Sequence, residues 1–182
     1  MDAITHLILL TILAAATVTD LRSRRIPNLL TFPAMVLGLA LHAATGGWSG
    51  LLLALGGLGL GLGLMLVPFL FGVMGAGDVK LMAAAGAFLG AGAVLKAFVF
   101  TSLAGGVYAL AVLALRPAIL ARSLGAMRDS LNLFLATRQF AYAPAPTGSL
   151  PKLAYGAAIA AGTVASLLHS GGVAAFIPHW WA

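Results

Sequence analysis

The chain has 182 residues, of which 62% are hydrophobic and only 8% are charged, and its mean hydropathy is +1.07. Soluble domains carry about a quarter charged residues, so this composition excludes a water-soluble protein and predicts a chain that lies mostly in a membrane. The net charge of +6 comes from basic residues spread over short loops, which is not the pattern of a nucleic-acid-binding surface.

Six apolar stretches approach the length of about 20 residues that a helix needs to cross a bilayer. They are residues 3–19, 29–45, 50–71, 79–91, 93–115 and 153–169. The first has no basic region before it and no small-residue cleavage site, so we interpret it as a membrane span and not as a signal peptide. The sequence therefore predicts an all-α fold, a single membrane-embedded domain over 1–182 built as a polytopic helix bundle.

The basic residues predict how this bundle is oriented. If the N-terminus lies outside and six spans alternate, nine of the ten Lys and Arg residues fall on the cytoplasmic side, and only Lys96 falls on the other. The reverse orientation would place nine outside, which the positive-inside rule disfavours. We therefore expect both termini outside and residues 20–28, 72–80 and 116–152 in the cytoplasm.

The segment 116–152 precedes the last span and carries its own pattern. Apolar residues recur at helical steps, namely Leu120, Leu124, Met127, Leu131 and Leu135. This spacing predicts an amphipathic helix on the cytoplasmic membrane surface, next to membrane lipids, although a solvated connector packed on the bundle has the same pattern. A proline-rich link over 143–151 follows it.

The glycine-rich run 56–63 alternates with a period of two, as a strand would. The apolar stretch around it is too long for a barrel strand, and no companion segment alternates in the same way. Gly57 with Gly61 and Gly59 with Gly63 are instead pairs of small residues at helical spacing, which let neighbouring helices approach closely.

Metal and thiol chemistry find no support in the sequence. The chain has no cysteine, which excludes disulfides, a thiol nucleophile and cysteine-ligated zinc. The four histidines fall near the predicted outer side on different segments, without ligand spacing; they are His6, His42, His169 and His179. We expect no metal site and no cofactor.

The chain has only four acidic residues, all aspartates. Asp2 lies at the terminus and Asp129 lies among arginines. Asp20 and Asp78 lie at the cytoplasmic ends of predicted spans, where a carboxylate is unfavourable unless it is paired or used. Two carboxylates that share one proton form a general acid and a general base, which can activate water against a peptide carbonyl.

Other roles for these aspartates fit the same positions. Asp78 can cap the helix that follows it, and Asp20 can pair with Arg22 or Arg24. A small transporter or channel with the aspartates in a proton or cation relay is the main alternative function, although its spans would need polar lining that these lack. A non-catalytic assembly subunit is a further alternative, in which both aspartates are replaceable.

Three segments together resemble the type IV prepilin peptidases, a family of GxGD membrane aspartyl proteases. They are Asp-Leu-x4-Ile-Pro-Asn at 20–28, Gly-x-Gly-Asp-Val-Lys-Leu at 75–81, and a looser Tyr155-Gly156 segment within 150–162. Presenilin-type proteases also use GxGD, but their other aspartate follows a tyrosine in mid-helix, whereas Thr19 precedes Asp20 here.

The resemblance implies an aspartic endopeptidase in the bacterial inner membrane that removes the basic leader from pilin-like precursors at the cytoplasmic face, in pilus biogenesis and protein secretion. It assigns Asp20 and Asp78 as the catalytic pair. The supporting and substrate-binding residues that it suggests are Gly75, Gly77, Lys80, Pro27, Asn28, Tyr155 and Gly156. Lys80 is expected to tune the pair, to hold a lipid phosphate or to anchor the span. Without the Cys-x-x-Cys part of bifunctional members, the chain resembles the compact tight-adherence (Flp) branch, and N-methyltransferase activity is not expected.

Overall fold

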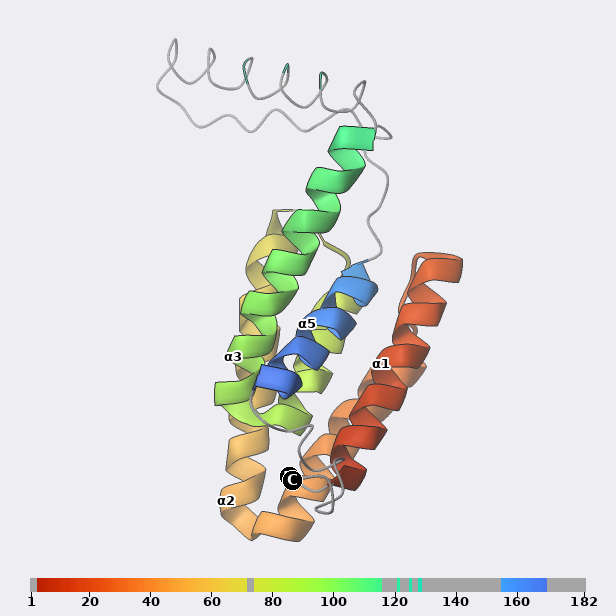
Figure 1. Ribbon diagram of the computed structural model, residues 1–182. Helices are drawn as coiled ribbons and strands as arrows, with labels where there is room; N and C mark the ends of the chain where they lie inside the picture. The colour runs from red at the N-terminus through yellow and green to blue at the C-terminus, as the bar shows by residue number, and fades with distance from the viewer. Residues whose placement is uncertain are drawn as a thin grey trace, which may run out of the picture. The chain divides into compact units, whose positions relative to one another are not determined.

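The computed structural model describes residues 3–71, 74–115 and 155–169, together with residues 121, 125 and 128. Four helices make up these residues, α1 (Ala3–Ser23), α2 (Asn28–Leu70), α3 (Ala76–Leu115) and α5 (Tyr155–His169), and no strand occurs within the described ranges (Figure 1). The all-α prediction is confirmed. By length and composition α1, α2 and α3 can each cross a membrane, and α5 is a shorter apolar helix.

The chain divides into two compact units. The first comprises Met1–Gly105 and Ala154–Ala182, and the second comprises Gly106–Leu153. Everything described below belongs to the first unit. The predicted amphipathic helix and proline-rich link fall almost wholly outside the described residues, as does His179.

Helix α2 is broken at Gly47. A straight helix of its 43 residues would be about 65 Å long, roughly twice the thickness of the hydrocarbon layer. Gly47 has φ 58° and ψ −140°, a left-handed conformation that only glycine adopts readily. Beyond it the chain folds back, which brings Gly50 close to the backbone of His42, eight residues earlier. A Cβ added at Gly50 would lie 3.0 Å from the carbonyl carbon of His42. Figure 1 shows this reversal at the lower end of α2.

Helix α3 has the same kind of break at Gly90, with φ 75° and ψ 172°. Gly47 lies between the predicted spans 29–45 and 50–71, and Gly90 lies at the end of the predicted span 79–91. The breaks thus fall at predicted boundaries, although the number of membrane crossings remains a prediction.

Glycines bring α2 and α3 into close contact. A Cβ on Gly57 would lie 2.7 Å from Cα of Gly90, and a Cβ on Gly61 would lie 2.6 Å from the carbonyl oxygen of Met82. Gly59 and Gly63 have nothing within 4 Å of an added Cβ. The glycine run is therefore helical, as predicted. Of the two predicted close-packing pairs, Gly57 with Gly61 makes the contact, whereas the described part of the chain leaves space around the other pair.

The packed core lies along the first part of α3. The fully buried large side chains include Phe88, Leu81 and Met82 from α3, Leu9 and Leu13 from α1, Met65 from α2 and Ile159 from α5. The side chains of α1 and α2 that point away from this core are largely apolar and exposed, as a lipid-facing surface requires. The core sets the positions of the helix ends that carry the two aspartates.

Candidate active site

Asp20 lies in the last turn of α1, which runs on to Ser23. Its side chain is only 6% exposed. The helix ends at Arg24, whose φ of 52° is left-handed and whose backbone N–H donates to the carbonyl oxygen of Asp20 at 2.8 Å. This is the usual αL end of a helix, with arginine at a position that glycine normally occupies. The turn directs the chain from Asp20 into the segment that contains Pro27 and Asn28.

The carboxylate of Asp20 is held by the start of α5. The backbone N–H of Gly156 donates to Oδ2 of Asp20 at 2.9 Å, across 136 residues of sequence. The first N–H groups of a helix have no partner within it, and they attract negative charge. A Cβ on Gly156 would lie 2.9 Å from that same oxygen, so glycine is what allows α5 to approach Asp20 this closely.

Asp78 is the third residue of α3 and is 8% exposed. The backbone N–H of Gly75 donates to its Oδ2 at 3.0 Å, and the carbonyl oxygen of Gly75 accepts from the N–H of Asp78 at 3.1 Å. This is the reciprocal bond of a capping box, made here by an aspartate in place of the usual glutamate. The expectation that Asp78 precedes the helix is corrected: α3 begins at Ala76, and Asp78 stabilises its first turn from within.

Asp20 and Asp78 lie at the same end of the unit, because Ile26, in the turn after α1, packs against Gly77 of α3. Their carboxylates are close enough to interact electrostatically. The charge of Asp78 also acts on the hydroxyl of Tyr155, the residue that precedes Gly156. The ring of Tyr155 packs on α3, where a Cβ added at Gly105 would lie 2.7 Å from its hydroxyl oxygen. Tyr155 and Gly156, the predicted site residues of the third segment, thus lie at the same end of the unit as the aspartates of the first two segments.

The remaining predicted residues connect the segments 20–28 and 75–81. A Cβ on Gly77 would lie 3.1 Å from Cβ of Ile26, so this glycine lets the two segments pack together. The ammonium of Lys80 donates to Oδ1 of Asn28 at 2.8 Å and lies 5.2 Å from the ring centre of Phe32. The polar contact that the structure gives Lys80 is thus with Asn28. The sequence had suggested that Lys80 tunes the aspartates, holds a lipid phosphate or anchors the span. Pro27 is the exposed residue before α2, and its carbonyl oxygen accepts from the first turn of α2.

The sequence did not single out three contributors to this arrangement. Ile26 is buried, with 8% exposure. The sequence signal for this burial was an apolar residue in a loop that is otherwise basic. Phe32 and Gly105 lie within apolar spans, where nothing in the sequence separates them from lipid-facing neighbours. Their roles depend on which helices pack together.

The chemistry available at this site is that of carboxylates. Within the described residues no group of three or more His, Cys, Asp or Glu side chains lies together to hold a metal ion. Asp20 and Asp78 are buried carboxylates on separate helices, each held by one backbone N–H, and a carboxylate has further lone pairs that can accept a hydrogen bond from water. Because like charges at short range cannot both ionise easily, such a pair can hold one proton and work as acid and base.

Comparison with protein-family models matches the type IV leader peptidase family over residues 7–110, which is more than half of the chain. Neither curated proteins nor solved structures gave a match. The matched range contains Asp20, Asp78 and their segments, while Tyr155 and Gly156 lie beyond it. The family implies a leader peptidase, and the long apolar helices are those of a membrane protein. This chain is a member of the type IV leader peptidase family.

Proposed function

We propose that the chain is a membrane aspartyl endopeptidase that cleaves the basic leader from pilin-like precursors. The observation that supports the proposal most is that Asp20 and Asp78 are both buried carboxylates at the same end of the unit, close enough to interact electrostatically. In a chain with four acidic residues, two of them at one site need an explanation. General acid and base catalysis supplies it.

The proposed reaction needs no covalent intermediate. The ionised aspartate takes a proton from a water molecule, whose oxygen bonds to the carbonyl carbon of the scissile peptide. The protonated aspartate gives its proton to the peptide nitrogen as the C–N bond breaks, so that a carboxylic acid and an amine leave and the two aspartates have exchanged protonation states. The backbone N–H groups of Gly156 and Gly75 hold the two side chains in place, which keeps their oxygens aligned for both proton transfers.

The proposed location follows from the charge distribution. With six spans and the N-terminus outside, the aspartate end of the unit faces the cytoplasm of a bacterial cell, where a basic leader would remain. The precursor is expected to enter as a helix beside the bundle and to present its leader junction at the membrane surface. Peptidase activity without N-methyl transfer is proposed, as for the compact branch of the family.

The test is cleavage of a co-expressed pilin-like precursor by the parent and by Asp20→Asn and Asp78→Asn, all confirmed in the membrane fraction. Asp129→Asn is the matched control, because it makes the same change at an aspartate that the proposed reaction does not use. We expect the parent and the control to shorten the precursor and the two site variants to leave it intact. Cleavage by both site variants would make the aspartates structural, and a proton or cation relay would then be tested by ion flux in vesicles.

A double variant sharpens this test. Residues that act as one catalytic unit show strongly non-additive losses. The combination of Asp20→Asn with Asp78→Asn is therefore expected to be no slower than the slower single variant. Losses that multiply would mean that the two aspartates act independently.

A further inference from the structure

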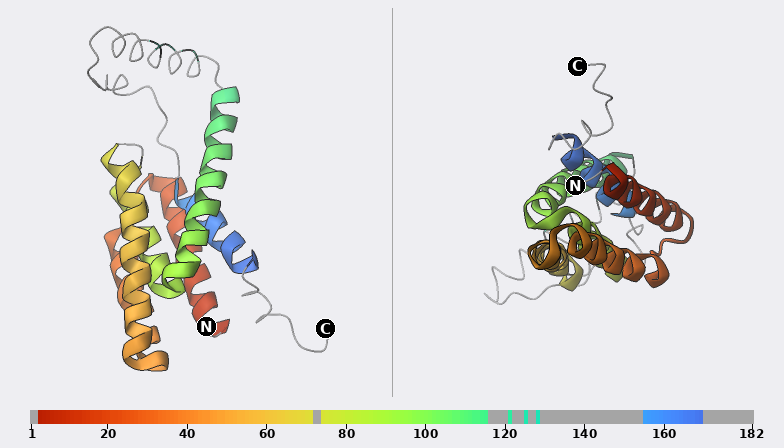
Figure 2. Two further views of the ribbon diagram at one scale, coloured as in Figure 1. Left: turned by 90° about the vertical axis from the view of Figure 1, so that its left-hand side faces the viewer. Right: turned by 90° about the horizontal axis from the view of Figure 1, so that it is seen from below.

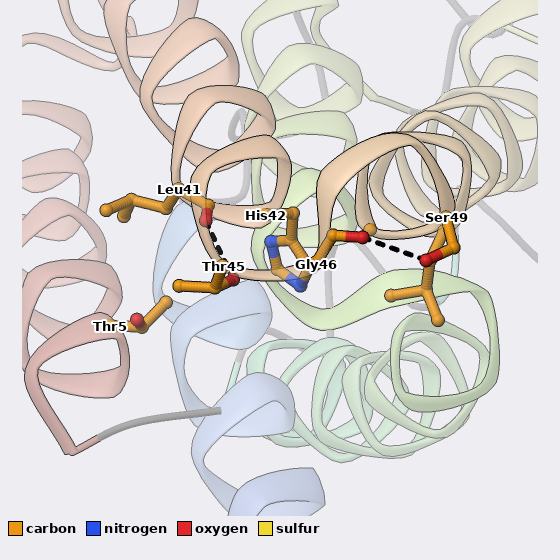
Figure 3. Close-up of a pocket in the computed structure, with 8 residues that line it drawn as sticks. Thr5, Leu41, His42, Thr45, Gly46 and Ser49 are labelled. Atoms are coloured by element: carbon orange, nitrogen blue, oxygen red, sulfur yellow. Dashed lines mark hydrogen bonds between the residues drawn. The ribbon is translucent and has the colours of Figure 1, made fainter.

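A cavity of about 440 Å³ lies at the bend of α2, at the opposite end of the unit from the aspartates. It is lined by Thr5 of α1 and by Leu41, His42, Thr45, Gly46, Ser49, Gly50 and Leu53 of α2 (Figure 3). Figure 1 shows this bend at the lower end of α2, and Figure 2 shows it from the side and from below. The proposed peptidase reaction does not use this cavity.

The side chains of the cavity present hydrogen-bond acceptors. Nδ1 of His42 lies 3.1 Å from the carbonyl oxygen of Gly38. A carbonyl can only accept, so Nδ1 carries the proton, and in the neutral ring Nε2 has a free lone pair. The hydroxyl of Thr45 donates to the carbonyl oxygen of Leu41 at 2.9 Å, and that of Ser49 donates to Gly46 at 2.8 Å. His42, Thr45 and Ser49 thus use their own protons in bonds to backbone carbonyl oxygens, and each keeps a lone pair that can accept a hydrogen bond.

The helix ends at the cavity do not set the sign of its ligand, because two of them meet there. The last carbonyl groups of the first part of α2, which ends at Gly47, carry partial negative charge, and the first N–H groups of the second part carry partial positive charge. None of the residues found to line the cavity is Lys or Arg. An anion therefore finds no cationic side chain among them, whereas a cation with several N–H donors finds the three acceptors.

The shape and position of the cavity narrow the choice of cation. Thr45, Gly46 and Ser49 are exposed, so the cavity opens at the surface, while Leu41 and Leu53 supply apolar walls. A primary ammonium has three N–H donors, as many as the acceptors offered by His42, Thr45 and Ser49. In the predicted arrangement of six spans, the aspartates lie at one membrane surface and this bend of α2 lies near the other, at the depth of lipid head groups.

We propose that this cavity binds the primary ammonium of a phospholipid head group, as in phosphatidylethanolamine, through Nε2 of His42 and the hydroxyl oxygens of Thr45 and Ser49. Such charge-assisted bonds are stronger than bonds between neutral groups. Bound lipid would hold the two parts of α2 together at the bend. The inference is independent of the proposed peptidase reaction.

The test is the melting temperature of the purified chain in detergent micelles that contain one added lipid. Phosphatidylethanolamine is compared with phosphatidylcholine, which has the same phosphate and a positive charge but no N–H donor. We expect phosphatidylethanolamine to raise Tm by about 2–4 °C more than phosphatidylcholine does. Free ethanolamine is included to show whether the lipid chains are needed, and an equal rise from the free amine would overturn the lipid assignment.

Variants of the cavity locate the effect. Thr45→Val and Ser49→Ala each remove one acceptor from a partly exposed residue, and we expect both to reduce the difference between the two lipids. Thr11→Val is the matched control, because Thr11 is also exposed and donates to a carbonyl four residues earlier. A lipid difference that survives in Thr45→Val and Ser49→Ala would overturn the proposal. So would a rise in Tm produced by Zn²⁺ or Ni²⁺ alone and removed by a chelator, since that would make His42 a metal ligand.

Discussion

At the scale of single residues, the two aspartates differ in how the fold holds them. Asp78 is fixed within its own segment, because Gly75, three residues earlier, donates to it. Asp20 depends on α5, which arrives from the other end of the sequence to supply the N–H of Gly156. The position of the Asp20 carboxylate is therefore tied to the docking of α5, whereas that of Asp78 is set by its own segment.

This dependence makes Gly156→Ala a specific prediction. The added methyl would lie 2.9 Å from Oδ2 of Asp20, so α5 or the carboxylate has to move. We expect kcat for precursor cleavage to fall by about tenfold or more, because small displacements at a reacting group have large effects. KM should change little, since the contact that the added methyl disturbs is the one between Gly156 and Asp20.

Gly59→Ala is the control for this variant, because nothing lies within 4 Å of its added Cβ. We expect it to cleave at the parental rate. An unchanged kcat in Gly156→Ala, in protein of parental abundance, would mean that the contact between α5 and Asp20 is not needed for the reaction.

Lys80 gives a second prediction at this scale. Its bond to Asn28 and its position over Phe32 connect the starts of α3 and α2. Lys80→Met keeps most of the apolar stem and removes both interactions. We expect a fall in the cleavage rate of about three- to tenfold, because one partly exposed polar contact is modest and only positions the aspartates indirectly.

Lys96→Met provides the comparison, since Lys96 is exposed and lies beyond the break in α3. It should leave cleavage unchanged. If Lys80→Met abolished cleavage as completely as Asp78→Asn does, Lys80 would have to act on the substrate itself.

At the scale of the helices, the contact between α2 and α3 depends on missing side chains. Gly57 and Gly86 face each other, and a Cβ on Gly86 would lie 2.6 Å from the carbonyl carbon of Gly57. On either glycine, an added Cβ would meet backbone atoms of the other helix, which cannot rotate away as a side chain can. In a membrane, where apolar burial does not drive helices together, such close packing supplies much of the association energy.

Gly86→Ala is therefore expected to destabilise the protein by ~2 kcal/mol, which lowers Tm by about 4–8 °C in micelles. Gly63→Ala changes the same residue type in the same helix pair, but its Cβ meets open space. It should keep or slightly raise Tm, because alanine favours the helix more than glycine does. Equal losses in the two variants would show that the contact between Gly86 and Gly57 does not set the effect.

The helices also show how far the sequence could predict the fold. Apolar length was enough to locate the helices and the boundaries between spans, because the bilayer thickness limits each span. The breaks at Gly47 and Gly90 could not be picked out among 23 glycines. The sequence also could not predict which glycines pack closely, since Gly57 and Gly59 differ only in the helix face that they occupy.

The candidate site was more predictable than the packing around it. Asp20 and Asp78 are conspicuous because acidic residues are so rare in the chain, and their segments carry the family resemblance. The bond from Gly156 to Asp20 joins residues 136 apart, so no local pattern reports it. Ile26 and Phe32 were missed for the same reason, because an apolar residue in an apolar chain gains a role only from its neighbours.

At the scale of the whole molecule, the open question is how often the chain crosses the membrane. A helix pair that folds back at Gly47 and another at Gly90 fit six crossings, with these bends at one surface and the aspartates at the other. If the bends instead lie within the hydrocarbon, α2 and α3 enter the membrane and turn back without crossing it. The two arrangements place the same residues in different surroundings.

Single cysteines distinguish these arrangements, and the native chain has no cysteine to give a background. Trp48, next to the bend in α2, is 72% exposed, and Gly92, next to the bend in α3, has open space around an added Cβ. In spheroplasts, a membrane-impermeant maleimide should label Trp48→Cys and Gly92→Cys directly. It should label Arg25→Cys, in the exposed turn after α1, only after the membrane is permeabilised. Labelling of Arg25→Cys in intact spheroplasts would reverse the orientation and place the aspartates outside. Failure to label residues 48 and 92 from either side would place the bends within the bilayer and make α2 and α3 re-entrant hairpins in place of two pairs of crossings.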